Sequence, residues 1–159
     1  MNDASGNEKL QELYREVVLE HARNPRNFYK LDDATHTAAG INPLCGDKIH
    51  LYLVVDADQQ VANVSFEGSG CAISMASASL LTETISTLSV PDANACFEAV
   101  TSRLSNESPS DSGPAKLGHS NLRALDGVRQ HPSRIKCATL AWQTLHAALQ
   151  QTHITATTE

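Results

Sequence analysis

Ile49-His50-Leu51-Tyr52-Leu53-Val54-Val55 sets the architecture of this chain, because its apolar residues recur at every second position. This period of two is typical of a strand that buries one face. Residues 56–60 (Asp-Ala-Asp-Gln-Gln) are typical of a turn, and residues 61–67 predict a returning strand. The two stretches therefore predict an antiparallel hairpin. On one side of the returning strand we expect Ala62, Val64 and Phe66.

Further elements follow on both sides of this hairpin. Residues 33–40, rich in Thr and Ala, predict a weaker first strand. Residues 105–113 are rich in Ser, Pro and Asp, which is typical of a flexible link. The sequence contains neither an internal repeat nor a second domain, so we expect one domain over residues 1–150 and a flexible tail over residues 151–159. Apolar residues at helical spacing predict helices over residues 8–22, 71–87, 91–104, 122–128 and 134–149.

The composition of the 159 residues limits the classes of function. Hydrophobic residues make up 41%, which suffices for a core, and 12 Lys and Arg against 18 Asp and Glu leave a net charge of −6. Nucleic acids and anionic membrane surfaces bind proteins with basic surfaces. Because this chain carries a net negative charge, we expect neither as a partner. No segment approaches the roughly 20 apolar residues of a spanning helix, and the N-terminus lacks the apolar core of a signal peptide. We therefore expect a cytoplasmic protein with reduced thiols.

The four cysteines are Cys45, Cys71, Cys96 and Cys137, and the predicted meander brings two of them together. The second strand runs away from the Cys45 loop and the third strand returns, so that Cys71 arrives at the same end of the sheet. Asp47 lies two residues after Cys45, and the glycine between them permits a sharp bend. The sequence therefore predicts that Cys45, Asp47 and Cys71 face one cavity.

Cys71 and Cys137 are both predicted at or near the start of a helix. The positive end of a helix favours a thiolate, and Arg134 and Lys136 beside Cys137 add positive charge, so we expect lowered thiol pKa values. Three thiolates and one carboxylate form a suitable tetrahedral site for Zn²⁺. Because a carboxylate is displaced more easily than a thiolate, Asp47 would leave such a site able to open.

Each candidate also has a plainer interpretation. A lone cytosolic cysteine is more often a small core residue than a ligand, and Cys137 fits that interpretation because apolar residues continue its helix face. Asp47 could cap a turn. Cys96 lies in an Ala-rich predicted helix and is expected to fill the core. His50 and His119 are candidates to approach the site, although solvent or core positions suit them better.

The candidate ligands lie in three motifs: Asn42-Pro43-Leu44-Cys45-Gly46-Asp47, Gly68-Ser69-Gly70-Cys71-Ala72-Ile73-Ser74 and Arg134-Ile135-Lys136-Cys137-Ala138-Thr139-Leu140-Ala141-Trp142. In this order and spacing they resemble the U-type iron–sulfur cluster assembly proteins. The resemblance implies an α+β fold, a three-stranded antiparallel sheet packed on one face by helices, which agrees with the predicted elements. It also implies that Cys45, Asp47, Cys71 and Cys137 are metal and cluster ligands.

Two features are similar to the SufU branch of this family. Lys136 stands where scaffold members of the IscU type carry His, and an extra stretch covers roughly residues 106–130. The resemblance implies a tightly held Zn²⁺ and a zinc-dependent sulfur acceptor for a pyridoxal-phosphate-dependent cysteine desulfurase (SufS-like). Arg134 matches an arginine of that branch and is expected to support the site. In a loop beside the displaceable Asp47, Cys45 is expected to be the thiol that takes the sulfur.

Other functions remain open at this point. The protein could be a scaffold on which a [2Fe–2S] cluster is assembled and then transferred to apo iron–sulfur proteins. It could also hold a structural zinc and bridge partners, or act as a metal-independent thiol enzyme, although no motif contains an obvious His base. As an enzyme it would be at most a zinc-dependent sulfurtransferase that acts with a desulfurase.

Overall fold

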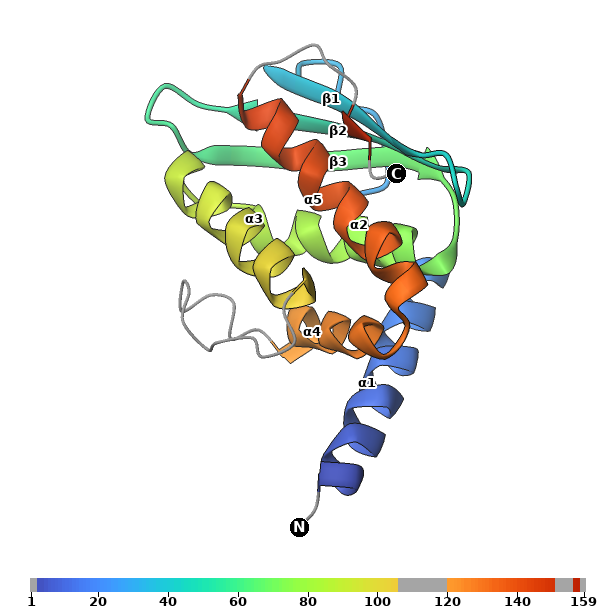
Figure 1. Ribbon diagram of the computed structural model, residues 1–159. Coiled ribbons are helices and arrows are strands. Elements are labelled where there is room, and N and C mark those ends of the chain that lie inside the picture. The colour runs from blue at the N-terminus through green and yellow to red at the C-terminus, as the bar shows by residue number, and fades with distance from the viewer. Residues whose placement is uncertain (1–2, 106–119, 151–155, 158–159) are drawn as a thin grey trace.

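The computed structural model describes residues 3–105, 120–150 and 156–157, and it shows a sheet covered on one face by helices (Figure 1). The strands are β1 (His36–Asn42), β2 (Asp47–Val55), β3 (Val61–Ser69) and β4 (Ala156–Thr157). The helices are α1 (Asp3–Arg23), α2 (Ala72–Ile85), α3 (Val90–Ser105), α4 (Ser120–Arg123) and α5 (Ile135–Leu149), with the 3₁₀ helices η2 (Ala124–Gln130) and η3 (Pro132–Arg134) before α5. The predicted α+β architecture is confirmed.

The first three strands form the predicted antiparallel meander, in the spatial order β3-β2-β1. Asn42 pairs with Asp47 at one end of the β1–β2 ladder, and Lys48 pairs with Ser69 at the same end of the β2–β3 ladder. The loop that precedes β2 and the residues that follow β3 therefore meet at one end of the sheet. This meeting point positions the site described below.

One predicted strand face was partly wrong. Val64 and Phe66 are buried, whereas Ala62 is exposed. The register between β2 and β3 shifts between Val54 and Val55, which leaves Ala62 as an extra residue without a partner in β2. An extra residue of this kind interrupts the alternation of side chains, so that Ala62 does not share the face of its neighbours.

The C-terminal segment adds a short fourth strand to the sheet. Ala156–Thr157 runs parallel to β1 beside residues 40–41. The predicted flexible tail over residues 151–159 thus contains two residues that pair with the sheet. The described part of the chain does not include the other residues of this tail, most of the predicted link over residues 105–113, or His119. The domain boundary at residue 150 stays a prediction.

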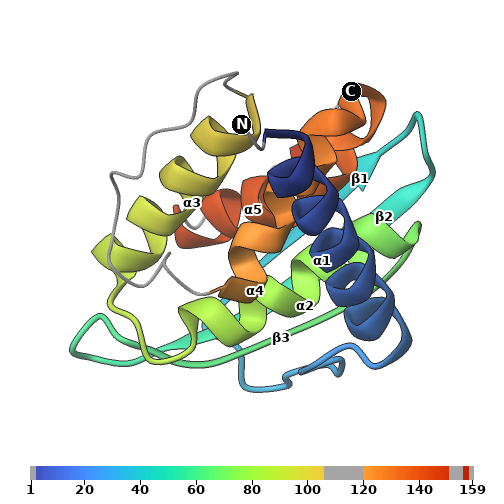
Figure 2. The ribbon, with the colours of Figure 1, turned by 90° about the horizontal axis from the view of Figure 1, so that it is seen from below.

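Helices α2 and α5 pack directly against the sheet, and α1 and α3 lie beside them on the same side (Figures 1 and 2). Gly40 shows how closely α5 approaches β1, since a Cβ atom there would lie 2.0 Å from Thr144 Oγ1. A larger residue at position 40 would require the side chain of Thr144 in α5 to shift. In the described part of the chain, no helix has the length and apolar character needed to cross a membrane.

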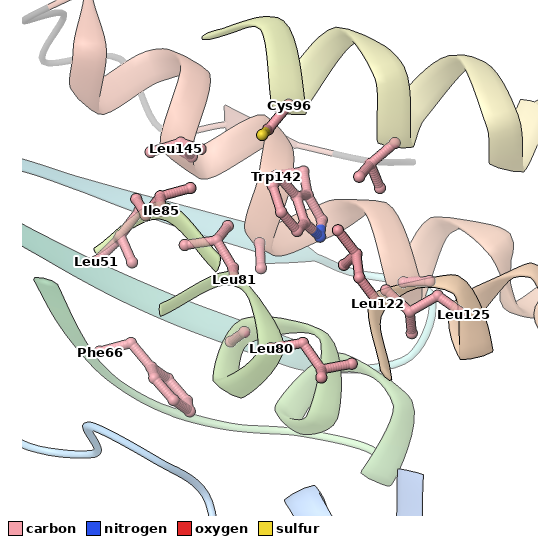
Figure 3. Close-up of a cluster of buried hydrophobic side chains, with 14 of the residues drawn as sticks. Leu51, Phe66, Leu80, Leu81, Ile85, Cys96, Leu122, Leu125, Trp142 and Leu145 are labelled. Carbon is pink, nitrogen blue, oxygen red and sulfur yellow. The ribbon is translucent and has the colours of Figure 1, made fainter. Parts of the chain in front are cut away.

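The core lies between the sheet and these helices, with Trp142 of α5 at its centre (Figure 3). The indole is fully buried and its Nε1–H donates a hydrogen bond to Ser77 Oγ at 3.1 Å. Ser77 in turn donates to the carbonyl of Ala138 at 2.6 Å, so that the polar atoms at the α2–α5 contact are satisfied. Cys96 of α3 is fully buried in this cluster, as expected for a filling residue.

His21 joins α1 to α2 and to the loop that follows α1. The residue is 2% exposed, and its Nδ1 lies 2.7 Å from Ser79 Oγ, which also accepts a hydrogen bond from the Arg26 N–H at 2.8 Å. Burial, together with the charge of Arg26, lowers the pKa of His21 below its ordinary value of 6.5. The folded protein therefore favours the neutral imidazole.

Acidification should therefore weaken the fold through His21. Because the unfolded chain binds this proton at a higher pH than the folded chain, the free energy of unfolding should fall as the pH drops below about 6.5, until the folded-state pKa is passed. Urea unfolding between neutral and mildly acidic pH measures this slope. His21→Gln should reduce the slope, whereas His50→Gln at an exposed position should not; equal slopes in wild type and His21→Gln would rule out the assignment.

Candidate metal centre

The loop between β1 and β2 presents Cys45 at the surface. The N–H groups of Cys45 and Gly46 both donate to the carbonyl of Asn42, at 3.3 and 2.9 Å, which closes a tight turn. Gly46 has a φ of 73°, a conformation that glycine adopts without strain. The turn leaves the side chains of Leu44 and Cys45 exposed, with Leu44 at 74%. The loop therefore offers one accessible thiol beside an apolar side chain.

Asp47 begins β2 and turns its carboxylate inward, where it is 1% exposed. Its Oδ1 accepts a hydrogen bond from the Cys71 N–H at 2.8 Å, and its Oδ2 lies 3.9 Å from Cys71 Sγ. Gly70 makes this approach possible, because a Cβ atom there would lie 2.5 Å from Asp47 Oδ1. The carboxylate is thus fixed between the ends of two strands, as the meander predicts.

Cys71 follows β3 and caps helix α2. Its backbone is extended, and its Sγ accepts from the N–H of Ser74 at 3.5 Å. The predicted position of Cys71 at the start of this helix is therefore confirmed, and the thiol is half-buried. The Ser74 contact gives the sulfur one of the N–H groups that the first helical turn leaves without carbonyl partners.

Cys137 enters the site from the first turn of α5. It is fully buried, and its Sγ lies 3.5 Å from Cys45 Sγ. The ligand atoms of Cys45, Asp47 and Cys137 all lie within 4.8 Å of one another. Cys71 is not part of this set of three, but its Sγ lies 3.9 Å from Oδ2 of Asp47, which is. The four residues predicted as ligands therefore converge, although they are remote along the chain.

The donor set fits a zinc ion. Two thiolates on one tetrahedral Zn²⁺, with Zn–S bonds of about 2.3 Å, lie about 3.8 Å apart. The distance between Cys45 Sγ and Cys137 Sγ is 3.5 Å. Sulfur donors with a single carboxylate are chemically suited to Zn²⁺ and also to iron in sulfide clusters.

The pKa of Cys137 differs from the prediction. Burial raises its pKa well above the ordinary value, and hydrogen bonding with Cys45 and the negative charge of Cys71 raise it further. The predicted lowering by nearby positive charge is therefore wrong for this thiol, because loss of solvation outweighs it. The raised pKa keeps Cys137 protonated in the metal-free protein, so metal binding to this sulfur must release a proton.

Arg134 and Lys136 lie differently with respect to the site. A hydrogen bond to Cys137, and then the charges of the three site cysteines, raise the pKa of Arg134. Lys136 is exposed, and none of the described hydrogen bonds joins it to the site. Adjacent residues on a helix point about 100° apart, so Lys136 faces away when Cys137 faces inward.

Asn42 lies in the first of the three motifs, but the sequence alone indicates no role for it in the site. It is 1% exposed, and its Nδ2 donates to Asp47 Oδ2 at 3.4 Å and to Cys137 Sγ at 3.7 Å. Its Oδ1 is buried without a hydrogen-bond partner. A buried orphan of this kind costs about 1–3 kcal/mol. We interpret Asn42 as the residue that orients Asp47 and Cys137 toward each other.

His50, by contrast, does not approach the site. It is exposed and stacks on Tyr52 with ring centroids 4.5 Å apart. Because side chains alternate along a strand, His50 projects from the sheet face opposite to that of Ile49 and Leu51, which are buried. His50 is therefore not a ligand candidate.

The comparisons agree with this arrangement. The family model for the NifU-like N-terminal domain matches residues 13–157. The chain is 40% identical over 141 residues to the zinc-dependent sulfurtransferase SufU of Bacillus subtilis, covering 89% of this chain and 92% of that protein. It is 39% identical over 139 residues to the iron–sulfur cluster assembly scaffold protein IscU of Thermotoga maritima, covering 87% and 94%.

A solved structure has the same fold. The crystal structure of a putative iron–sulfur cluster assembly scaffold protein for the SUF system from Fervidobacterium islandicum AW-1 superposes with a TM-score of 0.77 at 27% identity, covering 87% of this chain and 97% of that one. Fold, site residues and sequence similarity over most of the chain lead to one conclusion: this protein belongs to the NifU-like N-terminal domain family.

Proposed function

We propose that this protein works in iron–sulfur cluster assembly in the cytoplasm, as a zinc-dependent acceptor of sulfur from a pyridoxal-phosphate-dependent cysteine desulfurase. One observation carries the proposal: an exposed thiol, Cys45, is grouped with a buried carboxylate, Asp47, and a buried thiol, Cys137. The name of the Bacillus subtilis relative, a zinc-dependent sulfurtransferase, supports it.

Cys45, Asp47, Cys71 and Cys137 would hold the Zn²⁺. The ion would keep the thiols deprotonated and shielded from oxidation. A site that needs only structural zinc is usually closed by cysteine and histidine. The carboxylate of Asp47 in this set favours a site that opens, which argues against a purely structural role.

Cys45 is proposed to take the sulfur because it is the accessible thiol of the group. Its thiolate would attack the terminal sulfur of the desulfurase persulfide. A new S–S bond forms to Cys45, the S–S bond of the desulfurase breaks, and the desulfurase cysteine leaves as a thiolate. No external oxidant or reductant is needed, since the transferred sulfur carries its oxidation state and its proton with it.

The desulfurase would dock around the exposed loop. Leu44 offers an apolar anchor at 74% exposure, and the exposed side chains of Arg134 and Lys136 offer positive charge. Exposed charges at the rim of an interface speed association and make it sensitive to salt. We propose that the basic stretch from Arg123 to Lys136 contributes to this surface.

Elemental analysis of the purified protein tests the zinc assignment. We expect near-stoichiometric zinc after both aerobic and anaerobic purification, and a clear loss of zinc in Cys71→Ala, which removes one of the four ligands. Cys96→Ala is the matched control, because its thiol is buried away from the site. Unchanged zinc in Cys71→Ala would contradict the ligand set.

A second function, assembly of a [2Fe–2S] cluster for transfer to apo iron–sulfur proteins, is favoured by the name of the Thermotoga maritima relative, a cluster assembly scaffold protein. The donor set also suits iron in a sulfide cluster. Anaerobic reconstitution with iron and sulfide separates the two functions. A visible chromophore that passes to an apo-protein would favour the scaffold, whereas zinc without iron would favour the sulfur acceptor.

A further inference from the structure

A hollow of about 340 Å³ lies beside the metal centre and is separate from the Cys45 loop. It opens between α1, the first turn of α2 and the segment of η2 and η3. The described residues that line it are Tyr14, Cys71, Ala72, Ile73, His131 and Arg134. Of the four proposed zinc ligands, only Cys71 lines the hollow, so that this one thiol borders both spaces.

The wall of this hollow is suited to a negatively charged group. Arg134 contributes a permanent positive charge, and the first turn of α2 at Ala72 and Ile73 has N–H groups without carbonyl partners in the helix. Burial raises the pKa of Tyr14 to about 12, so its phenol stays a protonated donor at neutral pH. None of the six described lining residues is acidic.

Another part of the wall is apolar and already built. Tyr14 stacks on His131, with ring centroids 5.9 Å apart and an interplanar angle of 25°. Gln11 holds this pair in place: its Nε2–H donates to the carbonyl of Gly127 at 2.9 Å, and its Oε1 lies 3.3 Å from His131 Nε2. Gly127 fits tightly below the ring, since a Cβ atom there would lie 2.6 Å from Tyr14 Cβ. The hollow is therefore preorganised.

We propose that the hollow beside Cys71 binds a small thiol that carries a carboxylate, and that this thiol removes the sulfur from the protein. The inference rests on the proposed function, because it concerns the step after sulfur has been accepted. The carboxylate would lie against Arg134 and the first turn of α2, and the hydrocarbon part against Tyr14 and Ile73. The thiol of the ligand would then face Cys71.

The chemistry requires two exchange steps. First, the Cys71 thiolate attacks the terminal sulfur of the Cys45 persulfide, an S–S bond forms to Cys71, and Cys45 leaves as a thiolate. Second, the thiolate of the bound ligand attacks the terminal sulfur on Cys71, which leaves as a thiolate, and the ligand departs as a small persulfide. In both steps the proton stays on the transferred sulfur and the sum of oxidation states is unchanged.

A matched pair of small thiols tests this proposal. The protein is loaded with sulfur by a desulfurase, freed of small molecules, and mixed with N-acetylcysteine or with its neutral amide at equal thiolate concentration. Mass spectrometry follows the loss of one sulfur atom from the chain. We expect saturable removal by the carboxylate, about tenfold faster than by the amide, as one charge-assisted hydrogen bond provides.

Ala72→Glu supplies the decisive variant. Ala72 is exposed in the first turn of α2, where a carboxylate is compatible with the helix but repels an anionic ligand. We expect Ala72→Glu to remove the preference for N-acetylcysteine while sulfur loading is unchanged, and Ala72→Gln to keep the preference. Removal that is unsaturable, or indifferent to ligand charge in all three proteins, would overturn the inference. Failure of the wild type to load any sulfur would instead overturn the proposed function.

Discussion

Replacement of Cys45 by serine is expected to abolish sulfur acceptance, lowering desulfurase turnover in the presence of this protein by roughly 100-fold or more, because a hydroxyl is far less nucleophilic than a thiolate. Cys45 is the exposed thiol of the convergent group, and it lies in a short loop that the Asn42 carbonyl holds by two hydrogen bonds. Both the position and the chemistry of Cys45 therefore support its role as the thiol that accepts sulfur from the desulfurase. Mass spectrometry of the chain after incubation with desulfurase and cysteine gives a direct second readout.

Two controls make this result interpretable. Cys96→Ala should accept sulfur like the wild type, because Cys96 is buried in the core between α3 and α5. The zinc content of Cys45→Ser must also be measured. If the variant still binds zinc, its loss of activity can be attributed to the missing nucleophile. Full stimulation of the desulfurase by Cys45→Ser would contradict the assignment of Cys45 as acceptor. Sulfur found on Cys71 in that variant would identify Cys71 as the accepting thiol instead.

The sequence predicts the fold because the decisive patterns are local and strong. Period-two alternation identifies β2, and the turn after it fixes an antiparallel return. From the meander alone, Cys45, Asp47 and Cys71 arrive at one end of the sheet. The approach of Cys137 had no such topological argument. It depended on the resemblance of its motif, and the packing of α5 against β1 and β2 supplies the physical reason.

Other features could not be predicted because they depend on contacts between distant segments. The bulge at Ala62 requires knowledge of the pairing register, which shifts only at the end of the hairpin. The raised pKa of Cys137 requires knowledge of its burial, since its sequence neighbours alone suggest the opposite direction. The hollow beside Cys71 forms from three separate segments, and none of them carries a local signal for it.

Asn42 belongs to the same class, because its motif was quoted but its partners could not be inferred. A polar residue at the end of a strand ordinarily faces solvent or caps the turn. Here the side chain points inward and bridges Asp47 and Cys137, which are five and 95 residues away. Burial of Oδ1 without a hydrogen-bond partner costs free energy of folding, which indicates that the two contacts of Nδ2 are the reason for an amide at this position.

Replacement of Asn42 by alanine should therefore weaken zinc binding by about 10- to 100-fold, the range observed when residues that orient metal ligands are removed. Competition with a chromophoric chelator measures the affinity. The backbone carbonyl that closes the Cys45 turn stays in place, so the fold should persist. Asn42→Asp should weaken zinc binding in another way: it retains the shape but loses the donor, and adds a negative charge beside Asp47 and the thiolates.

The thermal stability of the metal-free proteins separates an orienting role from a merely structural one. In the metal-free state, Asn42→Ala loses two long hydrogen bonds but also removes the buried orphan oxygen, and these changes oppose each other. We therefore expect nearly equal melting temperatures for metal-free wild type and metal-free Asn42→Ala. We expect a clear difference once zinc is added, because zinc stabilises the folded protein according to how tightly it binds. If Asn42→Ala melted much earlier without zinc and yet bound zinc with wild-type affinity, the residue would be a packing element, and its bridge between Asp47 and Cys137 would have no role in the site.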